Sequence, residues 1–171
     1  MTRLPRLLLH LLVLAVLGLS VGGCGFHLRG EARLPASFAQ TYVTGLPSQD
    51  PLMRSLKAAL RANGVTLVRN PEAAGAVLTL MSLKTTRRAL TVSTLNQADS
   101  YALDMTLVFK AQATKGQWHM PPQTLSVQRQ YSLSTAQLQS QGPEEQLLRH
   151  SMSRELANLV LLRLQAYAGR P

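Results

Sequence analysis

Between Tyr101 and Gln112 the chain alternates apolar and polar side chains, which is the clearest strand pattern in the sequence. Successive side chains of a β-strand point to opposite faces, so the apolar residues of this stretch share one face. They are Tyr101, Leu103, Met105, Leu107 and Phe109, with Asp104, Thr106, Lys110 and Gln112 mostly opposite and Val108 as an apolar exception. The pattern predicts a strand whose one face is buried against a core.

The residues before this strand predict the other arm of a long hairpin. Residues 76–83 are apolar and β-branched, and the strand pattern continues from Thr85 to Thr94. Asn96 to Asp99 has the composition of a hairpin tip. Shorter strands are expected over 38–44 and 65–68, because both stretches are rich in strand-forming residues and end at turn signals.

The last strand of the sheet is expected after a break in the chain. Lys115-Gly116-Gln117 has the composition of a turn, and Pro121-Pro122 is expected to interrupt the chain before the strand begins. Beyond the prolines the apolar residues again share one face, with Arg129 among them. They are Leu125, Val127, Tyr131 and Leu133.

Two helices complete the predicted fold. Asp50 caps the first, Pro51 fits its first turn, and Asn63-Gly64 ends it. Gly142-Pro143 followed by two glutamates opens the second, whose apolar stripe runs to about Tyr167. The order β-α-β-β-β-α predicts an α+β fold: a mostly antiparallel or mixed β-sheet with two α-helices packed on one face.

The N-terminal segment predicts export from the cytoplasm. Arg3 and Arg6 precede an uncharged, leucine-rich run over residues 7–19, and small residues follow up to Gly23. This order is typical of a cleaved secretory signal peptide, here residues 1–23, because the run is shorter than the roughly 20 residues of a membrane span. An uncleaved membrane anchor is the alternative.

The single cysteine of the chain, Cys24, follows this segment directly. Val21-Gly22-Gly23-Cys24 resembles the bacterial lipobox, which predicts that Cys24 becomes the first mature residue, carrying an S-diacylglycerol and an N-acyl chain such as palmitate. Several acyl chains anchor a protein stably to a membrane. Gly25 stands where inner-membrane retention signals usually have aspartate, so we expect an outer-membrane protein that faces the periplasm. A free thiol, or an ordinary cleavage site beside a cysteine, is the alternative.

The mature chain is expected to have a lipidated N-terminus and tether over 24–36 and a single domain over 37–171. It shows no motif typical of an enzyme, a metal site or a cofactor site. Its histidines, His27, His119 and His150, are scattered and have no acidic partner at motif spacing. We therefore expect a non-enzymatic protein with neither a catalytic site nor a metal nor a cofactor.

The net charge of +10 indicates an anionic partner, because 18 basic residues face only 8 acidic ones. Lys84, Arg87, Arg88, Lys110 and Arg129 lie on the predicted strands and are candidates to bind a phosphorylated lipid. The alternative for each is a charged strand edge that discourages aggregation. Nucleic acid is not an expected partner, since aromatic residues make up only 5% of the chain and the predicted location is the periplasm.

Three stretches of the mature chain resemble the LptE family of lipopolysaccharide-assembly lipoproteins. They are CGFHLRG directly after the lipobox, LPASFAQTYVTG, and PLMRSLKAALRANGVTLV. The resemblance implies a protein that plugs and helps to assemble the outer-membrane β-barrel LptD. It also implies binding of lipopolysaccharide for delivery to the outer leaflet, with the five strand cations as candidate lipopolysaccharide-binding residues.

The sequence leaves two alternative functions to consider. The chain could be a structural lipoprotein subunit of another outer-membrane or envelope assembly, whose partner presents an acidic surface. A lipid-anchored hydrolase would need a paired nucleophile and base or a metal cluster, and the sequence offers neither.

Overall fold

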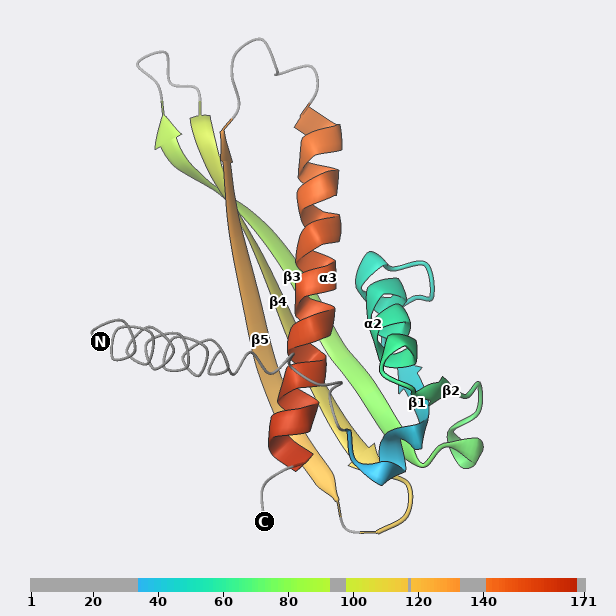
Figure 1. Cartoon of the computed structure of the whole chain (residues 1–171). Coiled ribbons are helices and arrows are strands. Elements are labelled where there is room, and N and C mark those ends of the chain that lie inside the picture. The colour runs from blue at the N-terminus through green and yellow to red at the C-terminus, as the bar shows by residue number, and fades with distance from the viewer. Residues whose placement is uncertain (1–33, 93–97, 117, 133–140, 169–171) are drawn as a thin grey trace, which may run out of the picture. The chain divides into compact units, whose positions relative to one another are not determined.

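The computed structural model describes residues 34–92, 98–116, 118–132 and 141–168. The predicted signal peptide, Cys24 and nearly all of the predicted tether lie outside these residues, as do Asn96 and Leu133. The elements, in chain order, are η2 (Ala36–Ala39), β1 (Gln40–Thr44), α2 (Pro51–Ala62), β2 (Thr66–Leu67), η3 (Pro71–Ala73), β3 (Ala76–Val92), β4 (Ala98–Ala113), β5 (His119–Ser132) and α3 (Gln141–Ala168) (Figure 1).

The strands form one mixed five-stranded sheet in the order β2-β1-β3-β4-β5. β3, β4 and β5 are long and antiparallel, whereas β1 pairs in parallel with both β2 and β3. The predicted alternation of β4 is confirmed, since Leu103, Leu107 and Phe109 have no exposed surface.

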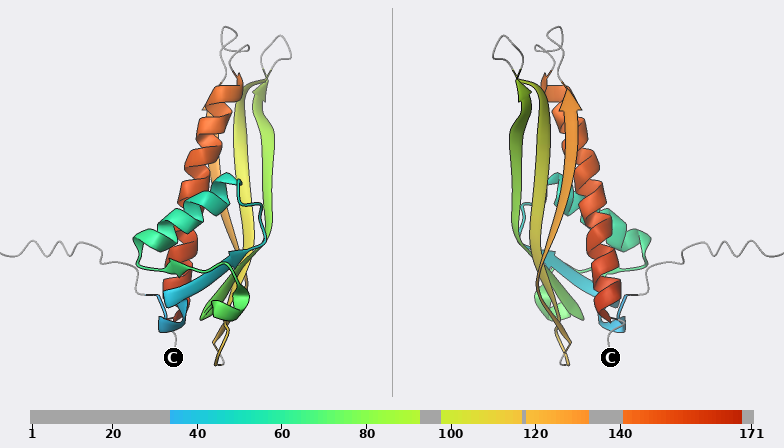
Figure 2. Two further views of the ribbon diagram at one scale, coloured as in Figure 1. Left: turned by 90° about the vertical axis from the view of Figure 1, so that its right-hand side faces the viewer. Right: turned by 90° about the vertical axis from the view of Figure 1, so that its left-hand side faces the viewer.

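Both helices cover the same face of the sheet and leave the other face uncovered (Figure 2). The predicted fold class, α+β with two helices on one face, is therefore confirmed. α2 begins where its sequence indicates, because the Asp50 carboxylate accepts hydrogen bonds from the N–H groups of Leu52 (2.8 Å) and Met53 (3.4 Å). It ends at Ala62 with Asn63 as its C-cap, and Gly64 follows with a left-handed φ of 77°.

The hydrophobic core lies between the sheet and the helices. The largest fully buried side chains come from η2, α2, β3, β4, β5 and α3; they are Phe38, Phe109, Leu52, Met53, Leu56, Leu60, Leu78, Leu80, Leu103, Leu107, Met120 and Met152. The apolar stripe of α3 continues through Leu156, Val160 and Leu164. Among the described residues, no helix is both long and apolar enough to cross a bilayer.

The first predicted strand was placed too early in the chain. Phe38 belongs to the short 3-10 helix η2, and β1 begins only at Gln40. The Phe38 N–H donates to the Pro35 carbonyl at 2.8 Å, and the Thr41 hydroxyl donates to the Phe38 carbonyl, also at 2.8 Å. These local bonds turn the chain so that the Phe38 ring is buried against Trp118, with 5.3 Å between the ring centroids.

The expected break at Pro121-Pro122 was wrong, since β5 starts at His119 and runs through both prolines. Its pairing with β4 shifts register between Phe109 and Ala111, and this shift lies opposite the two prolines. β5 is an edge strand of the sheet. Proline is tolerated at a bulge of an edge strand, because the missing N–H is not needed there for the ladder.

β3 is less regular than its sequence suggests. Its register against β4 shifts between Leu80 and Ser82, which makes Met81 an extra residue that is 50% exposed. A second irregularity lies around Leu90, which is 41% exposed. β1 pairs with β3 only as far as Thr79, so within the described residues β3 continues as an edge strand up to Val92.

Candidate functional site

The face of β3, β4 and β5 opposite the helices, here called the open face, is polar over most of its length. Asp104 and Thr106 alternate with the buried Leu103, Met105 and Leu107, so they point away from the core. The cross-strand register then assigns their neighbours to the same face. The open face includes Lys84, Thr86, Arg88, Asp104, Thr106, Lys110, Ser126 and Gln128.

Cross-strand hydrogen bonds order the middle of the open face. Arg88 Nε donates to Asp104 Oδ2 at 2.9 Å, and Gln128 Nε2 donates to Asp104 Oδ1 at 2.8 Å. The hydroxyls of Thr106 and Ser126 lie 3.0 Å apart. Asp104 thus links all three strands through one carboxylate and offsets the charge of Arg88.

Lys84 and Lys110 are the other two basic candidates on the open face. Both are exposed, and neither takes part in the ion pairs found among the described residues. Lys84 lies opposite Thr106, so the two lysines are separated by roughly 13 Å along the strand direction. The open face therefore offers two ammonium groups and one paired guanidinium among hydroxyl and amide side chains.

Arg87 lies on the other face of β3, beneath the N-terminal part of α3. Its Nη1 donates to Glu145 Oε2 at 3.3 Å, and its guanidinium carbon lies 5.0 Å from the centroid of the Tyr101 ring. Tyr101 stacks on Tyr131 with 5.6 Å between ring centroids. A hydrogen bond with the Tyr131 hydroxyl raises the pKa of Arg87 above its ordinary value, although burial opposes this effect.

Glu145 is the centre of this contact between sheet and helix. Its Oε1 accepts from Arg149 Nε at 2.8 Å and Nη2 at 2.6 Å, and its Oε2 accepts from the Tyr131 hydroxyl at 3.0 Å. Burial raises the pKa of Glu145, but the hydrogen bonds from Arg149 and Tyr131 and the charges of Arg149 and Arg87 outweigh it. The net result is a pKa below the ordinary value, and burial raises the pKa of Tyr131.

Arg129 also lies on the helix-covered face and pairs with Glu155 of α3. The structure therefore divides the five basic candidates between the two faces of the sheet. Lys84, Arg88 and Lys110 share the open face, whereas Arg87 and Arg129 are held by glutamates of α3. The reason is the two-residue period of a strand, which turns Arg87 and Arg88 to opposite sides.

The acidic partners were not predicted. Asp104 is the only acidic residue in the alternating stretch of β4 and could have been noticed as a cross-strand partner for an arginine. Glu145 and Glu155 lie 58 and 26 residues from the arginines that they bind, and no sequence spacing indicates those contacts.

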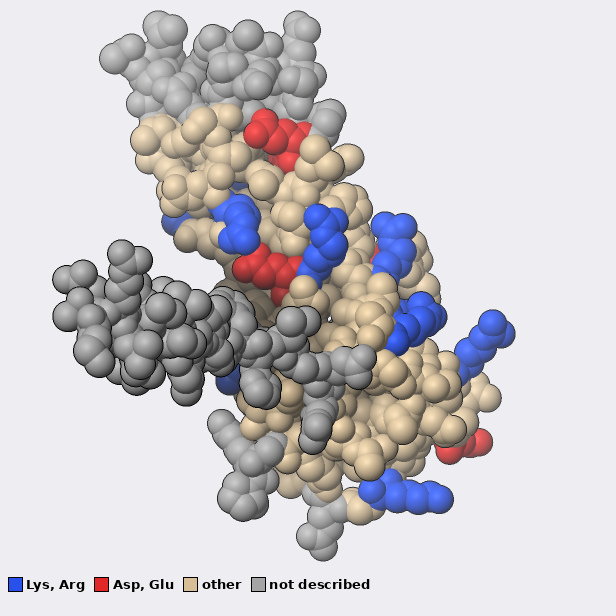
Figure 3. Space-filling model, in the orientation of Figure 1, with Lys and Arg blue, Asp and Glu red and all other residues tan. Residues whose placement is uncertain are grey.

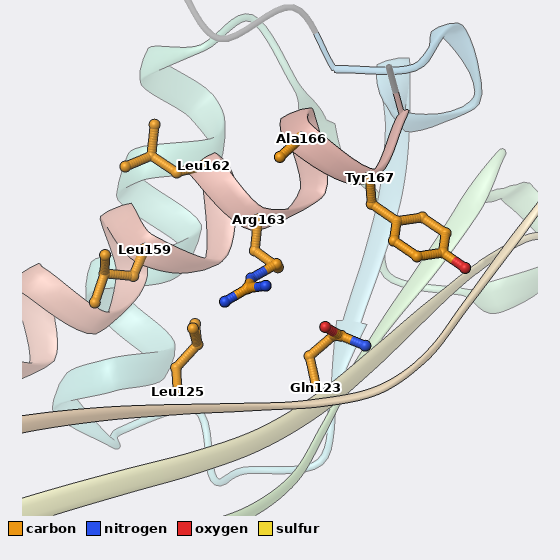
Figure 4. Close-up of a pocket in the computed structure, with 7 residues that line it drawn as sticks. All are labelled: Gln123, Leu125, Leu159, Leu162, Arg163, Ala166 and Tyr167. Atoms are coloured by element: carbon orange, nitrogen blue, oxygen red, sulfur yellow. The ribbon is translucent and has the colours of Figure 1, made fainter. Parts of the chain in front are cut away.

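A shallow hollow lies between β5 and the C-terminal part of α3 (Figure 4). It is lined by Gln123, Leu125, Leu159, Leu162, Arg163, Ala166 and Tyr167 and has a volume of about 200 Å³. That volume is below the roughly 300–1,000 Å³ of typical ligand pockets. Among the described residues, no group of three or more His, Cys, Asp or Glu side chains could hold a metal ion.

Solved bacterial lipoproteins share this two-layer α+β fold. The solution structure of an uncharacterized lipoprotein B from Nitrosomonas europaea has this fold, with a TM-score of 0.67 and 20% sequence identity, covering 84% of this chain and 92% of that one. A crystal structure of the rare lipoprotein B from Shewanella oneidensis matches with a TM-score of 0.64 and 20% identity, over 74% of this chain and 94% of that one.

Sequence comparison identifies the family. The model of the family LptE, described as lipopolysaccharide-assembly, matches residues 38–164. An LPS-assembly lipoprotein LptE from Photorhabdus laumondii is 27% identical over 91% of this chain and 86% of its own length. The chain therefore belongs to the LptE family of lipopolysaccharide-assembly lipoproteins, which are not enzymes.

Proposed function

We propose that this protein is an outer-membrane lipoprotein that plugs and helps to assemble an LptD-type β-barrel and binds lipopolysaccharide for delivery to the outer leaflet. In this proposal Cys24, with its S-diacylglycerol and N-acyl chains, holds residues 37–171 at the periplasmic side of the membrane. The single observation that carries the proposal is the open face, considered together with membership of the family.

The chemistry of the open face suits the inside of a barrel. Lumens of outer-membrane barrels are polar, so a plug needs hydroxyl, amide and charged groups where it meets the wall. Thr106, Ser126 and Gln128 provide such groups in ordered cross-strand bonds. Most apolar side chains of the same strands are already buried in the core between the sheet and the helices and are not needed for a partner.

The open face also provides the cations for lipopolysaccharide. Phosphate groups form strong, charge-assisted hydrogen bonds with ammonium and guanidinium groups. Lys84 and Lys110 offer their full charge, and Arg88 shares its charge with Asp104. Arg87 and Arg129 are 47% and 45% exposed, so they can reach an anion only while also bound to Glu145 and Glu155. Competition with the divalent ions that bridge lipopolysaccharide molecules would loosen the lipid aggregate.

The test of partner identity is extraction of native membranes in mild detergent and purification through a tag on the full-length chain. We expect a large outer-membrane β-barrel, of about 16 or more strands, to co-purify. Recovery of a different envelope complex without such a barrel would support the alternative, a structural lipoprotein subunit of another assembly. If the lipid anchors the domain, the Cys24→Ala variant should no longer be recovered in the outer-membrane fraction.

The lipid test compares charge reversal of three cations on the open face with charge reversal of three cations elsewhere. The triple variant Lys84→Glu, Arg88→Glu, Lys110→Glu should lower lipopolysaccharide binding by about tenfold or more, which corresponds to at least about 1.4 kcal/mol. Arg54→Glu, Lys115→Glu, Arg154→Glu is the matched control, because it changes three exposed cations outside the open face and outside α3–sheet ion pairs. Equal binding by both triple variants would contradict the role of the open face.

A further inference from the structure

A strongly basic hollow lies away from the open face, between α2 and the short parallel strands. It has a volume of about 500 Å³ and is lined by Tyr42, Val43, Ser48, Lys57, Arg61, Leu67, Val68 and Arg69. Lys57 and Arg61 stand one turn apart on α2, and Arg69 follows β2. Figure 3 shows Lys and Arg side chains gathered on the side of the molecule where α2 lies, with little acidic surface beside them.

We propose that this basic hollow is a binding site for a phosphomonoester on a headgroup the size of one sugar. The proposal goes beyond the function argued above, because the hollow shares no residue with the open face. Its three cations, one hydroxyl of Ser48 and one phenol of Tyr42 provide the donors that such a ligand needs.

The charge of the hollow is not balanced within the described structure. None of the eight lining residues is acidic, and the four ion pairs found among the described residues involve none of Lys57, Arg61 and Arg69. The position of Arg61 in the last turn of α2 favours a cation there through the helix dipole. That explanation does not extend to Lys57, in the middle of the helix, or to Arg69, outside it. A bound dianion would relieve the repulsion among all three.

The shape of the hollow favours a small phosphorylated headgroup over a protein surface. Its volume falls within the roughly 300–1,000 Å³ of small-molecule sites. Arg61 and Arg69 each present a planar guanidinium fork, which matches two phosphate oxygens at once, while Lys57 adds a point charge. Leu67, Val68 and Val43 also line the hollow, so a small part of its otherwise polar wall is apolar.

The experiment is calorimetric titration of the full-length lipoprotein in neutral detergent, at constant ionic strength, with glucose 1-phosphate. Glucose and a glutamate-rich peptide are titrated separately as the uncharged and the carboxylate probes, and inorganic phosphate as the free anion. We expect glucose 1-phosphate to bind, glucose not to bind, and the peptide to bind more weakly than either phosphate. We expect inorganic phosphate to bind more weakly than glucose 1-phosphate, and equal binding of the two would overturn the assignment of a sugar-sized headgroup.

The variant Lys57→Gln, Arg61→Gln, Arg69→Gln should weaken binding of glucose 1-phosphate at least tenfold. Arg54→Gln, Arg154→Gln is the matched control, because these exposed arginines line a separate hollow between α2 and α3. Thermal unfolding of each variant, followed by circular dichroism, checks that α2 is retained. Three further results would overturn the proposal: no binding to the wild type, an equal loss in the control, or tighter binding of the peptide than of the phosphates.

Discussion

Arg87 and Arg88 are neighbours in the chain but belong to two different surfaces. Arg87 lies under α3, on the ring of Tyr101 and beside Glu145, and it helps to hold the helix on the sheet. Arg88 lies on the open face, where its partner Asp104 comes from the adjacent strand. On the helix-covered face the charges join elements that are distant in sequence, whereas Lys84 and Lys110 of the open face take part in none of the ion pairs found among the described residues.

The difference between the two faces is first a difference in stability. Phe109 has no exposed surface and belongs to the core, while Val108, the next residue back, lies on the open face and is half-buried. Phe109→Ala should lower the free energy of unfolding by about 3–5 kcal/mol, because it removes a buried ring and leaves a cavity. Val108→Ala should cost about 0.5 kcal/mol, within the range of surface substitutions. Urea unfolding of both variants measures the two costs, and similar values would contradict the assignment of faces.

Glu145→Gln should produce the next largest effect, a loss of about 1–2 kcal/mol at pH 7, because charge-assisted hydrogen bonds from Arg149, Arg87 and Tyr131 are weakened together. The pKa of Glu145 is lower in the folded chain than its ordinary value of 4.5. Its contribution is therefore complete above pH 4.5 and is lost as the pH falls through the lower folded value. Unfolding midpoints measured between pH 7 and pH 3 should fall less steeply for the variant than for the wild type. Parallel curves would show that Glu145 does not carry this pH dependence.

Asp104→Asn should have the smallest effect on stability, between about 0 and 1 kcal/mol, since the Arg88–Asp104 pair is on the surface. The same change releases the charge of Arg88 and raises the net positive charge of the open face. It should therefore tighten binding to lipopolysaccharide. Measuring this binding separates the two roles of Asp104, which are to order the open face and to offset the charge of Arg88. Weaker binding would mean that the order imposed by Asp104 matters more than the charge it offsets.

Local sequence signals were sufficient to predict α2 and β4. The capping aspartate and the terminal Asn63-Gly64 define α2, and strict alternation defines β4. The order of the strands in the sheet was harder to predict from the sequence. β1 pairs in parallel with β2 and β3, and no turn connects these paired strands directly. Phe38 was predicted to lie in a strand because aromatic residues are common in strands. Hydrogen bonds to neighbouring residues instead place it in η2.

The surfaces were harder to predict than the elements. Met81 is one extra residue in β3, and it reverses which of the following side chains face the helices. Counting alternation from Leu80 would therefore assign Lys84 and Arg87 to the wrong faces. The ion pairs of Glu145 and Glu155 depend on how α3 lies across the sheet, which is a tertiary contact with no local signal. The lipidation of Cys24 stays a prediction.

The three antiparallel strands also have a length that bears on what the domain can span. β4 has 16 residues, which extend over roughly 50 Å in strand geometry. α3 has 28 residues, and a helix of that size is about 42 Å long. Both exceed the roughly 30 Å of a bilayer's hydrocarbon layer. If the domain plugs a barrel as proposed above, elements of this length contact the barrel wall at more than one depth.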